Sequence, residues 1–105
     1  VSGAYVTDGC YLYKGKQKLF MIWSSFNESG NYCIGVAKSA TGKITGPWIQ
    51  HPTPLYSKHG GHASIFHDLS GNLRIVLHSP NSPSPLERAK ILYLDDTGDN
   101  LVIKQ

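Results

Sequence analysis

The sequence predicts an all-β protein of two four-stranded antiparallel sheets, arranged as two blades of a β-propeller. The first observation is a repeat at an offset of 54 residues, which places 8–25 (DGCYLYKGKQKLFMIWSS) over 62–79 (HASIFHDLSGNLRIVLHS) without a gap. The second is that strand signals are dense and helix signals nearly absent. The third is that the second strand of each repeat is apolar on both faces. A repeated unit of this size is typical of a propeller, in which neighbouring units bury each other's faces.

The strands are predicted from apolar and β-branched runs that alternate with clusters of Gly, Pro, Asn, Asp and Ser. Four runs fall in each repeat, which is the number of strands in a propeller blade. The fourth strands correspond at an offset of 55, with Trp48 matching Ile103, so we expect one additional residue in a loop. We therefore expect 1–105 to be part of a single propeller domain, with one blade over 1–54 and the other over 55–105. The predicted strands are 9–14, 18–25, 31–38, 47–50, 62–67, 72–79, 87–94 and 101–104.

The second strand of each repeat is predicted to be covered on both faces. A strand with one solvated face alternates apolar and polar residues, whereas a strand covered on both faces is apolar throughout. Two blades cannot close a ring, so we expect the chain to pack against the rest of a propeller or to associate with itself. The apolar residues that alternate in these strands are Leu19, Met21 and Trp23 against Phe20 and Ile22, and Leu73, Ile75 and Leu77 against Val76, with Arg74 as the exception.

Composition and charge exclude some classes of partner. The net charge is only +3, and Lys14, Lys16 and Lys18 flank a predicted hairpin tip rather than a basic face, so nucleic-acid binding is not expected. No apolar run is long enough to span a bilayer, and the first residues lack the pattern of a signal peptide. Cys10 and Cys33 make no disulfide framework and are expected to be buried free thiols, because free cysteine behaves as a small hydrophobe. The alternative, that the two are spatial neighbours because both lie in predicted strands of one unit, stays open.

A candidate site follows from the geometry of the two first hairpins. If the turns centre near Lys16 and at Ser70, Asp8 faces Ser24 and His62 faces His78, with Cβ atoms about 5 Å apart. In a propeller the first strand of each blade lines the central channel, so these four side chains are expected at one mouth. Leu19, Met21, Leu73 and Ile75 should then be buried away from that end. Three structural alternatives stay open: Asp8-Gly9 is a common turn dipeptide, His62 after Gly60-Gly61 can be an ordinary loop histidine, and His78 beside Ser79-Pro80 can be a strand-end residue.

Three segments also carry a family resemblance. They are 6–14 (VTDGCYLYK), 35–39 with 44–48 (GVAKS and ITGPW), and 61–66 with 68–71 and 76–78 (GHASIF, DLSG and VLH). They resemble the E-G-P-x-L-Y-K, G-V-A-R-S … I-T-G-P-W and G-H-G-S-V-F … D-G-x-x-x-x-V-Y-H segments of glycoside hydrolase family 43. The resemblance covers nearly the whole chain in the same order. It implies a five-bladed propeller that hydrolyses arabinose- or xylose-containing glycans with inversion, of which this chain is the C-terminal portion, about two blades.

The resemblance also implies roles for individual residues. The general acid position, a glutamate in the family, falls on Asp8, while Cys10 replaces the usual proline and Ala63 a frequent glycine. His62 matches a residue that contacts a calcium ion through water in some relatives, and Arg88 resembles an arginine in the strand after Y-H. Ser24, His78 and Arg88 are expected to bind substrate. An exported enzyme, secreted or periplasmic, is implied by the resemblance alone.

We therefore expect part of a glycosidase that acts on a neutral oligosaccharide or polysaccharide and is inactive by itself, because only one of the two carboxyl groups that inverting hydrolysis needs is implied in this chain. The second hypothesis is a non-catalytic carbohydrate-binding propeller, in which Asp8 accepts a hydrogen bond from a sugar hydroxyl. The third is a purely structural unit whose faces pair with other blades or with a second copy.

Overall fold

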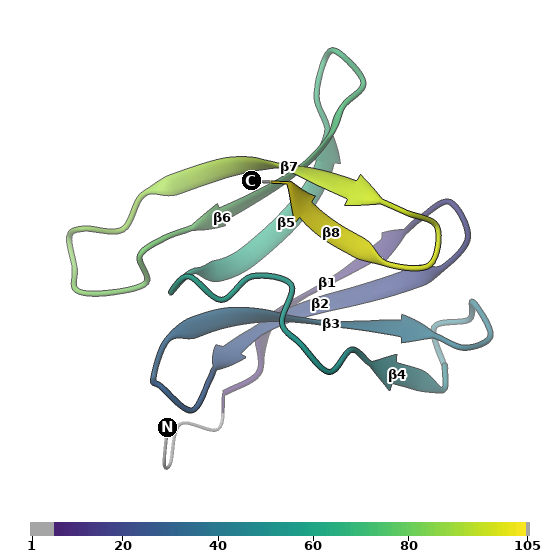
Figure 1. Cartoon of the computed structure of the whole chain (residues 1–105), viewed down its shortest axis with the longest axis horizontal. Helices are drawn as coiled ribbons and strands as arrows, with labels where there is room; N and C mark the ends of the chain where they lie inside the picture. Colours follow the sequence, from purple (N-terminus) through teal and green to yellow (C-terminus); the bar gives the residue numbers. More distant parts are fainter. Residues whose placement is uncertain (1–5, 105) are drawn as a thin grey trace.

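The computed structural model describes residues 6–104 and contains two four-stranded antiparallel sheets (Figure 1). The strands of each sheet follow chain order, and no helix occurs within residues 6–104. The eight strands confirm the predicted ones, with ends that differ by at most two residues. The first sheet contains β1 (Asp8–Lys14), β2 (Leu19–Phe26), β3 (Tyr32–Ser39) and β4 (Trp48–Gln50), and the second β5 (Gly61–His67), β6 (Leu73–His78), β7 (Ala89–Asp96) and β8 (Leu101–Lys104).

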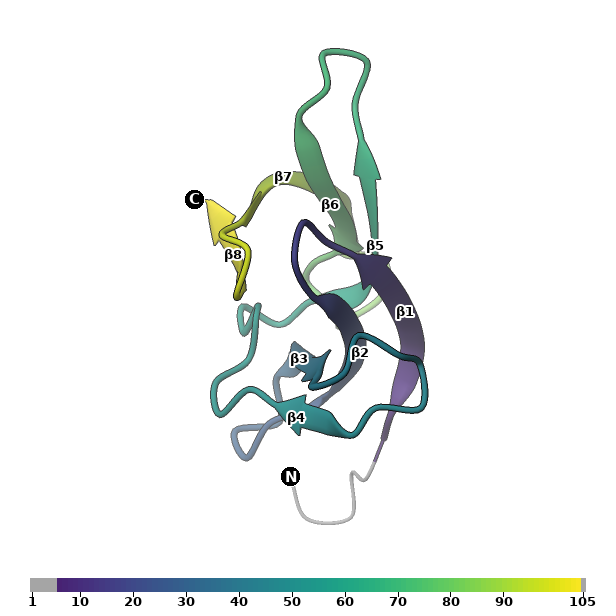
Figure 2. The same cartoon turned by 90° about the vertical axis from the view of Figure 1, so that its right-hand side faces the viewer.

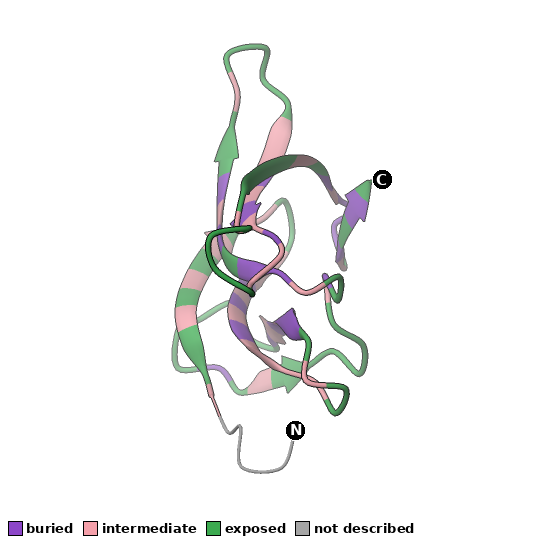
Figure 3. Ribbon diagram, turned by 90° about the vertical axis from the view of Figure 1, so that its left-hand side faces the viewer, coloured by how far each residue is buried: buried purple, intermediate pink, exposed green. Residues whose placement is uncertain are grey.

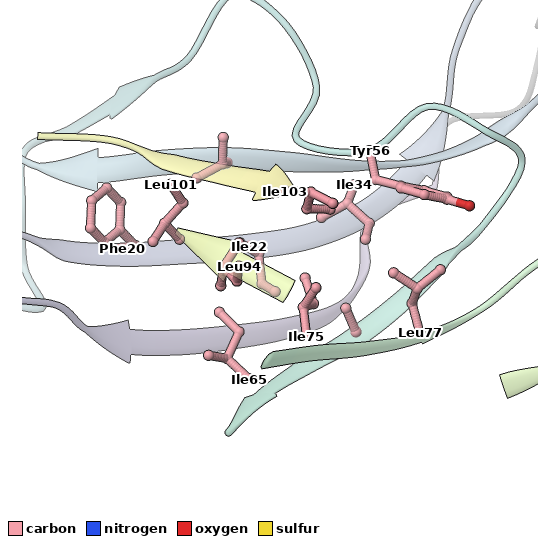
Figure 4. Packing of buried hydrophobic residues seen from close by; sticks show 12 residues of the cluster. Phe20, Ile22, Ile34, Tyr56, Ile65, Ile75, Leu77, Leu94, Leu101 and Ile103 are labelled. Carbon is pink, nitrogen blue, oxygen red and sulfur yellow. The ribbon is translucent and has the colours of Figure 1, made fainter. Parts of the chain in front are cut away.

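The two sheets pack face to face around one apolar core (Figure 4). Phe20, Ile22 and Ile34 of the first sheet and Ile75 of the second are each exposed by 1% or less. The opposite face of β2 is only half-buried, so the expected burial of Leu19 and Met21 is wrong. In β6 the expected burial is wrong for Leu73, which is half-buried, and confirmed for Ile75. The physical reason is that each sheet of this chain has one neighbouring sheet, which covers one face.

The repeat has three offsets along the chain rather than one. Asp8 pairs with Ser24, and Gly61 pairs with His78, so the first strands correspond at 53 residues and the second strands at 54. The third and fourth strands correspond at 55, because Lys38 pairs with Ile49 as Tyr93 pairs with Lys104. The match of Trp48 with Ile103 is therefore confirmed. The gap-free match of 8–25 with 62–79 is wrong in its first strand.

Contacts between the sheets are polar as well as apolar. The Tyr11 hydroxyl donates to the Ile65 carbonyl oxygen at 2.7 Å, and the Lys38 ammonium is 2.9 Å from an oxygen of Asp99. The pKa of Asp99 is held below its usual range, first by the hydrogen bond from Lys38. Cys33 is a buried free thiol, as expected, and burial raises its pKa. Cys10 is a free thiol in β1 that is exposed, so its expected burial is wrong.

Candidate functional site

The first pair of predicted site residues lies where the sequence placed it. Asp8 at the start of β1 is directly across from Ser24 in β2. Asp8 is exposed, whereas Ser24 is buried with 1% exposure. The Ser24 hydroxyl oxygen accepts a 2.7 Å hydrogen bond from the backbone N–H of His62 in the second sheet. Asp8, Ser24 and His62 therefore meet at the junction of the two sheets.

The second pair is shifted by one residue. His78 pairs with Gly61 and not with His62. Between this pair and the next, Ser64 with Val76, β5 advances by three residues and β6 by only two. This β-bulge inserts one residue into the first strand. The predicted pairing of His62 with His78 is therefore wrong, although both side chains line the same pocket.

The same bulge occurs at the start of both first strands. The register of β1 shifts between Asp8 and Tyr11, as that of β5 does between Gly61 and Ser64. The residue that follows the first pair of the strand has a positive φ in each case, 60° at Gly9 and 54° at His62. Histidine is among the non-glycine residues that tolerate this region. A Cβ atom at Gly9 would lie 3.1 Å from the His62 ring, so glycine at this position allows the imidazole to lie against β1.

Tyr32 connects these residues, and sequence reasoning missed it. Its hydroxyl donates to Asp8 Oδ1 at 2.6 Å, while its ring stacks on His78 with centroids 5.7 Å apart. Tyr32 is only 4% exposed. Burial, followed by the hydrogen bond to Asp8, raises the pKa of Tyr32 to about 12. The repeat gave no signal for this tyrosine, because the corresponding position in the second sheet, 55 residues later, is Glu87.

A pocket of about 310 Å³ lies on the second sheet beside this cluster. His78 Nε2 is 2.7 Å from the Asn81 side-chain oxygen, which fixes the plane of its ring. Arg88 is exposed, and its Nη1 donates to the carbonyl oxygens of Pro85 and Glu87 at 2.9 and 2.8 Å. Two predicted substrate-binding residues, His78 and Arg88, therefore share one pocket with His62. The lining residues are His62, Ser64, Val76, Leu77, His78, Glu87, Arg88 and Ala89.

Glu87 is a carboxyl group in the lining of this pocket, and it is absent from the predicted site. Histidine, arginine and carboxylate side chains around one pocket offer both donors and acceptors, which suits the hydroxyl groups of a sugar. The larger pocket, about 560 Å³, lies elsewhere, along β4, the segment 51–55 and β8, and none of the predicted site residues lines it.

The predicted calcium ion has no set of protein ligands among the residues that the structure describes. Within residues 6–104 no group of three or more His, Cys, Asp or Glu side chains could hold a metal ion. These residues do not by themselves fit a directly coordinated ion, and a contact from His62 through water stays a prediction. The same part of the chain contains no helix long and apolar enough to cross a membrane.

No family model matches the chain, and no curated protein matches it. Among solved structures, an endo-arabinase from Bacteroides thetaiotaomicron VPI-5482 is similar with a TM-score of 0.81 and 45% sequence identity, over 88% of this chain and 32% of that one.

Two further structures are similar over nearly the whole chain. An endo-1,4-beta-xylanase from the same organism has a TM-score of 0.79 at 20% identity, over 95% of this chain and 38% of that one. A thermostable family-43 glycoside hydrolase has a TM-score of 0.77 at 27% identity, over 94% of this chain and 35% of that one. The chain thus spans between 32% and 38% of the length of these proteins.

Proposed function

The chain has the fold of part of a family-43 glycoside hydrolase propeller, and on this premise we propose that it contributes to the cleavage of arabinose- or xylose-containing glycans. The observation that carries the proposal is the 45% identity to an endo-arabinase over 88% of the chain. The proposed substrate is a neutral oligosaccharide or polysaccharide, in keeping with a charged fraction of only 16%.

In this proposal Asp8 occupies the general acid position. Inverting hydrolysis needs a carboxylic acid that protonates the leaving oxygen, and a carboxylate base about 6.5–9.5 Å away that activates water. Asp8 is exposed, so a glycosidic oxygen can approach its carboxyl group. His78 and Arg88 at the neighbouring pocket bind sugar hydroxyls, and Ser24, being buried, positions His62 rather than touching substrate. The base is supplied by another part of the propeller, and the chain alone is expected not to turn over arylglycosides.

The proposal is tested by exchange with its solved neighbour. The chain replaces the aligned third of the endo-arabinase, and hydrolysis of arabinan is measured. In this chimera Asp8→Asn should lower kcat about a hundredfold or more with KM nearly unchanged, because it removes a proton donor and keeps the shape. The matched control is Asp99→Asn at the β7–β8 turn, which should leave kcat unchanged. A folded chimera that does not cleave arabinan contradicts the proposal.

The carbohydrate-binding alternative is favoured by one observation, that Asp8 Oδ1 already accepts a hydrogen bond from Tyr32. It predicts a different result from the same chimera. Asp8→Asn would then weaken the binding of an arabino-oligosaccharide in a calorimetric titration, and kcat would change no more than binding does.

A further inference from the structure

Two hydrogen bonds hold the paired residues Asp8 and Ser24 where the two sheets meet. A backbone N–H can only donate, so the bond from His62 N to Ser24 Oγ at 2.7 Å fixes Ser24 as its acceptor. The Tyr32 hydroxyl donates to Asp8 Oδ1 at 2.6 Å. Asp8 and Ser24 are paired across β1 and β2, so the two hydrogen bonds start from neighbouring positions of the first sheet.

The residues that form these two bonds are closely packed. Ser24 and Tyr32 are only 1% and 4% exposed. The Tyr32 ring contacts the ring of His78, with centroids 5.7 Å apart, and the ring of Phe26, with centroids 5.1 Å apart. A Cβ atom at Gly61 would lie 2.7 Å from Ser24 Oγ and 2.9 Å from the Tyr32 ring, so glycine there allows the second sheet to approach both.

The direction of the last bond is also fixed by chemistry. Burial and the neighbouring carboxylate raise the pKa of Tyr32 to about 12, so its hydroxyl stays protonated at neutral pH. The protonated Tyr32 hydroxyl is therefore the donor, and Asp8 Oδ1 is the acceptor. Within residues 6–104 no other hydrogen bond to the Asp8 side chain is formed, and Oδ2 is the oxygen left for a ligand.

We propose that Tyr32 is a positioning residue that holds Asp8 Oδ1 as an acceptor, so that Oδ2 is the oxygen that exchanges a proton or a hydrogen bond with the substrate. Aspartate has one rotatable bond fewer than the glutamate of the family, and the bond from Tyr32 fixes the orientation that remains. The reaction that Asp8 serves rests on the proposed function, whereas the hydrogen bond from Tyr32 to Asp8 does not.

The hydrogen bond from Tyr32 to Asp8 is tested on the chain itself by proton NMR of the hydroxyl groups. We expect a slowly exchanging Tyr32 hydroxyl resonance that is lost in Tyr32→Phe and kept in the control Tyr56→Phe. Tyr56 is also buried, at 5% exposure, and its hydroxyl donates to Ser79 at 3.2 Å. In Asp8→Asn the resonance should move upfield, since an amide oxygen is a weaker acceptor than a carboxylate. A Tyr32 resonance that is unchanged in Asp8→Asn overturns the proposal, and because Asp8 is exposed, this variant does not depend on repacking the core.

The positioning role is tested by kinetics in the endo-arabinase chimera. Tyr32→Phe keeps the ring and should lower kcat about tenfold with KM nearly unchanged, whereas Tyr56→Phe should change neither. Equal losses of kcat in both variants would assign Tyr32 a structural role only and overturn the proposal. A chimera without activity refutes the proposed function. The NMR result still decides whether Tyr32 donates its hydrogen bond to Asp8.

Discussion

The tip of the β1–β2 hairpin is held by the second sheet, whereas the tip of the β5–β6 hairpin is held by its own residues. At the first tip, the backbone N–H of Lys16 donates to Asp96 Oδ2 at 2.8 Å, and the other oxygen of Asp96 accepts from Gly98 N at 2.8 Å. Asp96 is buried, with 5% exposure. One carboxylate thus ties the β1–β2 tip to the β7–β8 turn.

The β5–β6 tip projects away from the sheets (Figure 2). Asp68 accepts hydrogen bonds from Ser70 N, Asn72 N and Arg74 Nε, all within the same hairpin, and Arg74 also lies 3.7 Å over the Tyr93 ring. Leu69 at the tip is fully exposed (Figure 3 shows the tip as exposed). Two copies of one unit therefore use different partners: where a neighbouring sheet lies alongside, its side chains replace the local hydrogen bonds.

The largest expected effect comes from the junction where the two sheets meet. Gly61→Ala places a methyl group 2.7 Å from Ser24 Oγ and should destabilise the chain by about 3 kcal/mol, measured by urea unfolding. Gly71→Ala at the β5–β6 tip is the matched control, because it has a φ of 84° but nothing within 4 Å. Its cost should be limited to backbone strain of about 1 kcal/mol. Equal losses for the two variants would show that the sheets do not approach each other at Gly61 as described.

A smaller loss is expected where the first tip meets the second sheet. Asp96→Ala leaves the N–H groups of Lys16 and Gly98 without an acceptor and should cost about 2 kcal/mol. Hydrogen exchange should accelerate at both the β1–β2 and the β7–β8 tips. Asp68→Ala should accelerate exchange only within its own hairpin. If Asp96→Ala left the β1–β2 tip protected, the contrast between the two hairpins would be wrong.

The smallest effect concerns pH. Lys38 holds the pKa of Asp99 below its usual range, and Arg74 does the same for Asp68. Because both folded-state pKa values are lowered, the stability these carboxylates add is present above the unfolded value of about 4 and is lost as the pH falls through the folded values. The urea midpoint should therefore fall on acidification from pH 6 to pH 3, and less steeply in Asp99→Asn than in the wild type. The effect should shrink with added salt, since both groups lie at the surface. If the urea midpoint depends on pH equally in the wild type and in Asp99→Asn, the Lys38–Asp99 pair does not stabilise the junction.

The strands and the position of the site at one end of the sheets could be predicted from the sequence. Apolar runs and turn residues are local signals, so all eight strands were found within two residues of their ends. The pairing of Asp8 with Ser24 was also predicted correctly. The roles of Asp8, Ser24, His62, His78 and Arg88, the division into blades and any calcium stay predictions.

What the sequence could not indicate depends on contacts between the sheets. The bulge that moves the pairing of His78 from His62 to Gly61 leaves no mark in the repeat, because the same bulge occurs in both first strands. Which face of β2 is buried was equally undetermined, since both faces are apolar and only the position of the second sheet selects Phe20 and Ile22.

The sequence by itself determined two four-stranded units and the polar residues at their common end, because hydrophobic periodicity and turn chemistry act over a few residues. Only the tertiary structure decided that Tyr32, which lies 24 positions from Asp8, donates to its carboxylate, and that Glu87 joins His62 and His78 at one pocket. The physical reason is that these contacts join segments that do not pair with each other, so they depend on how closely strands and sheets approach in space. That approach is set at Gly9 and Gly61 by the absence of a side chain, and the pattern of apolar residues carries no record of it.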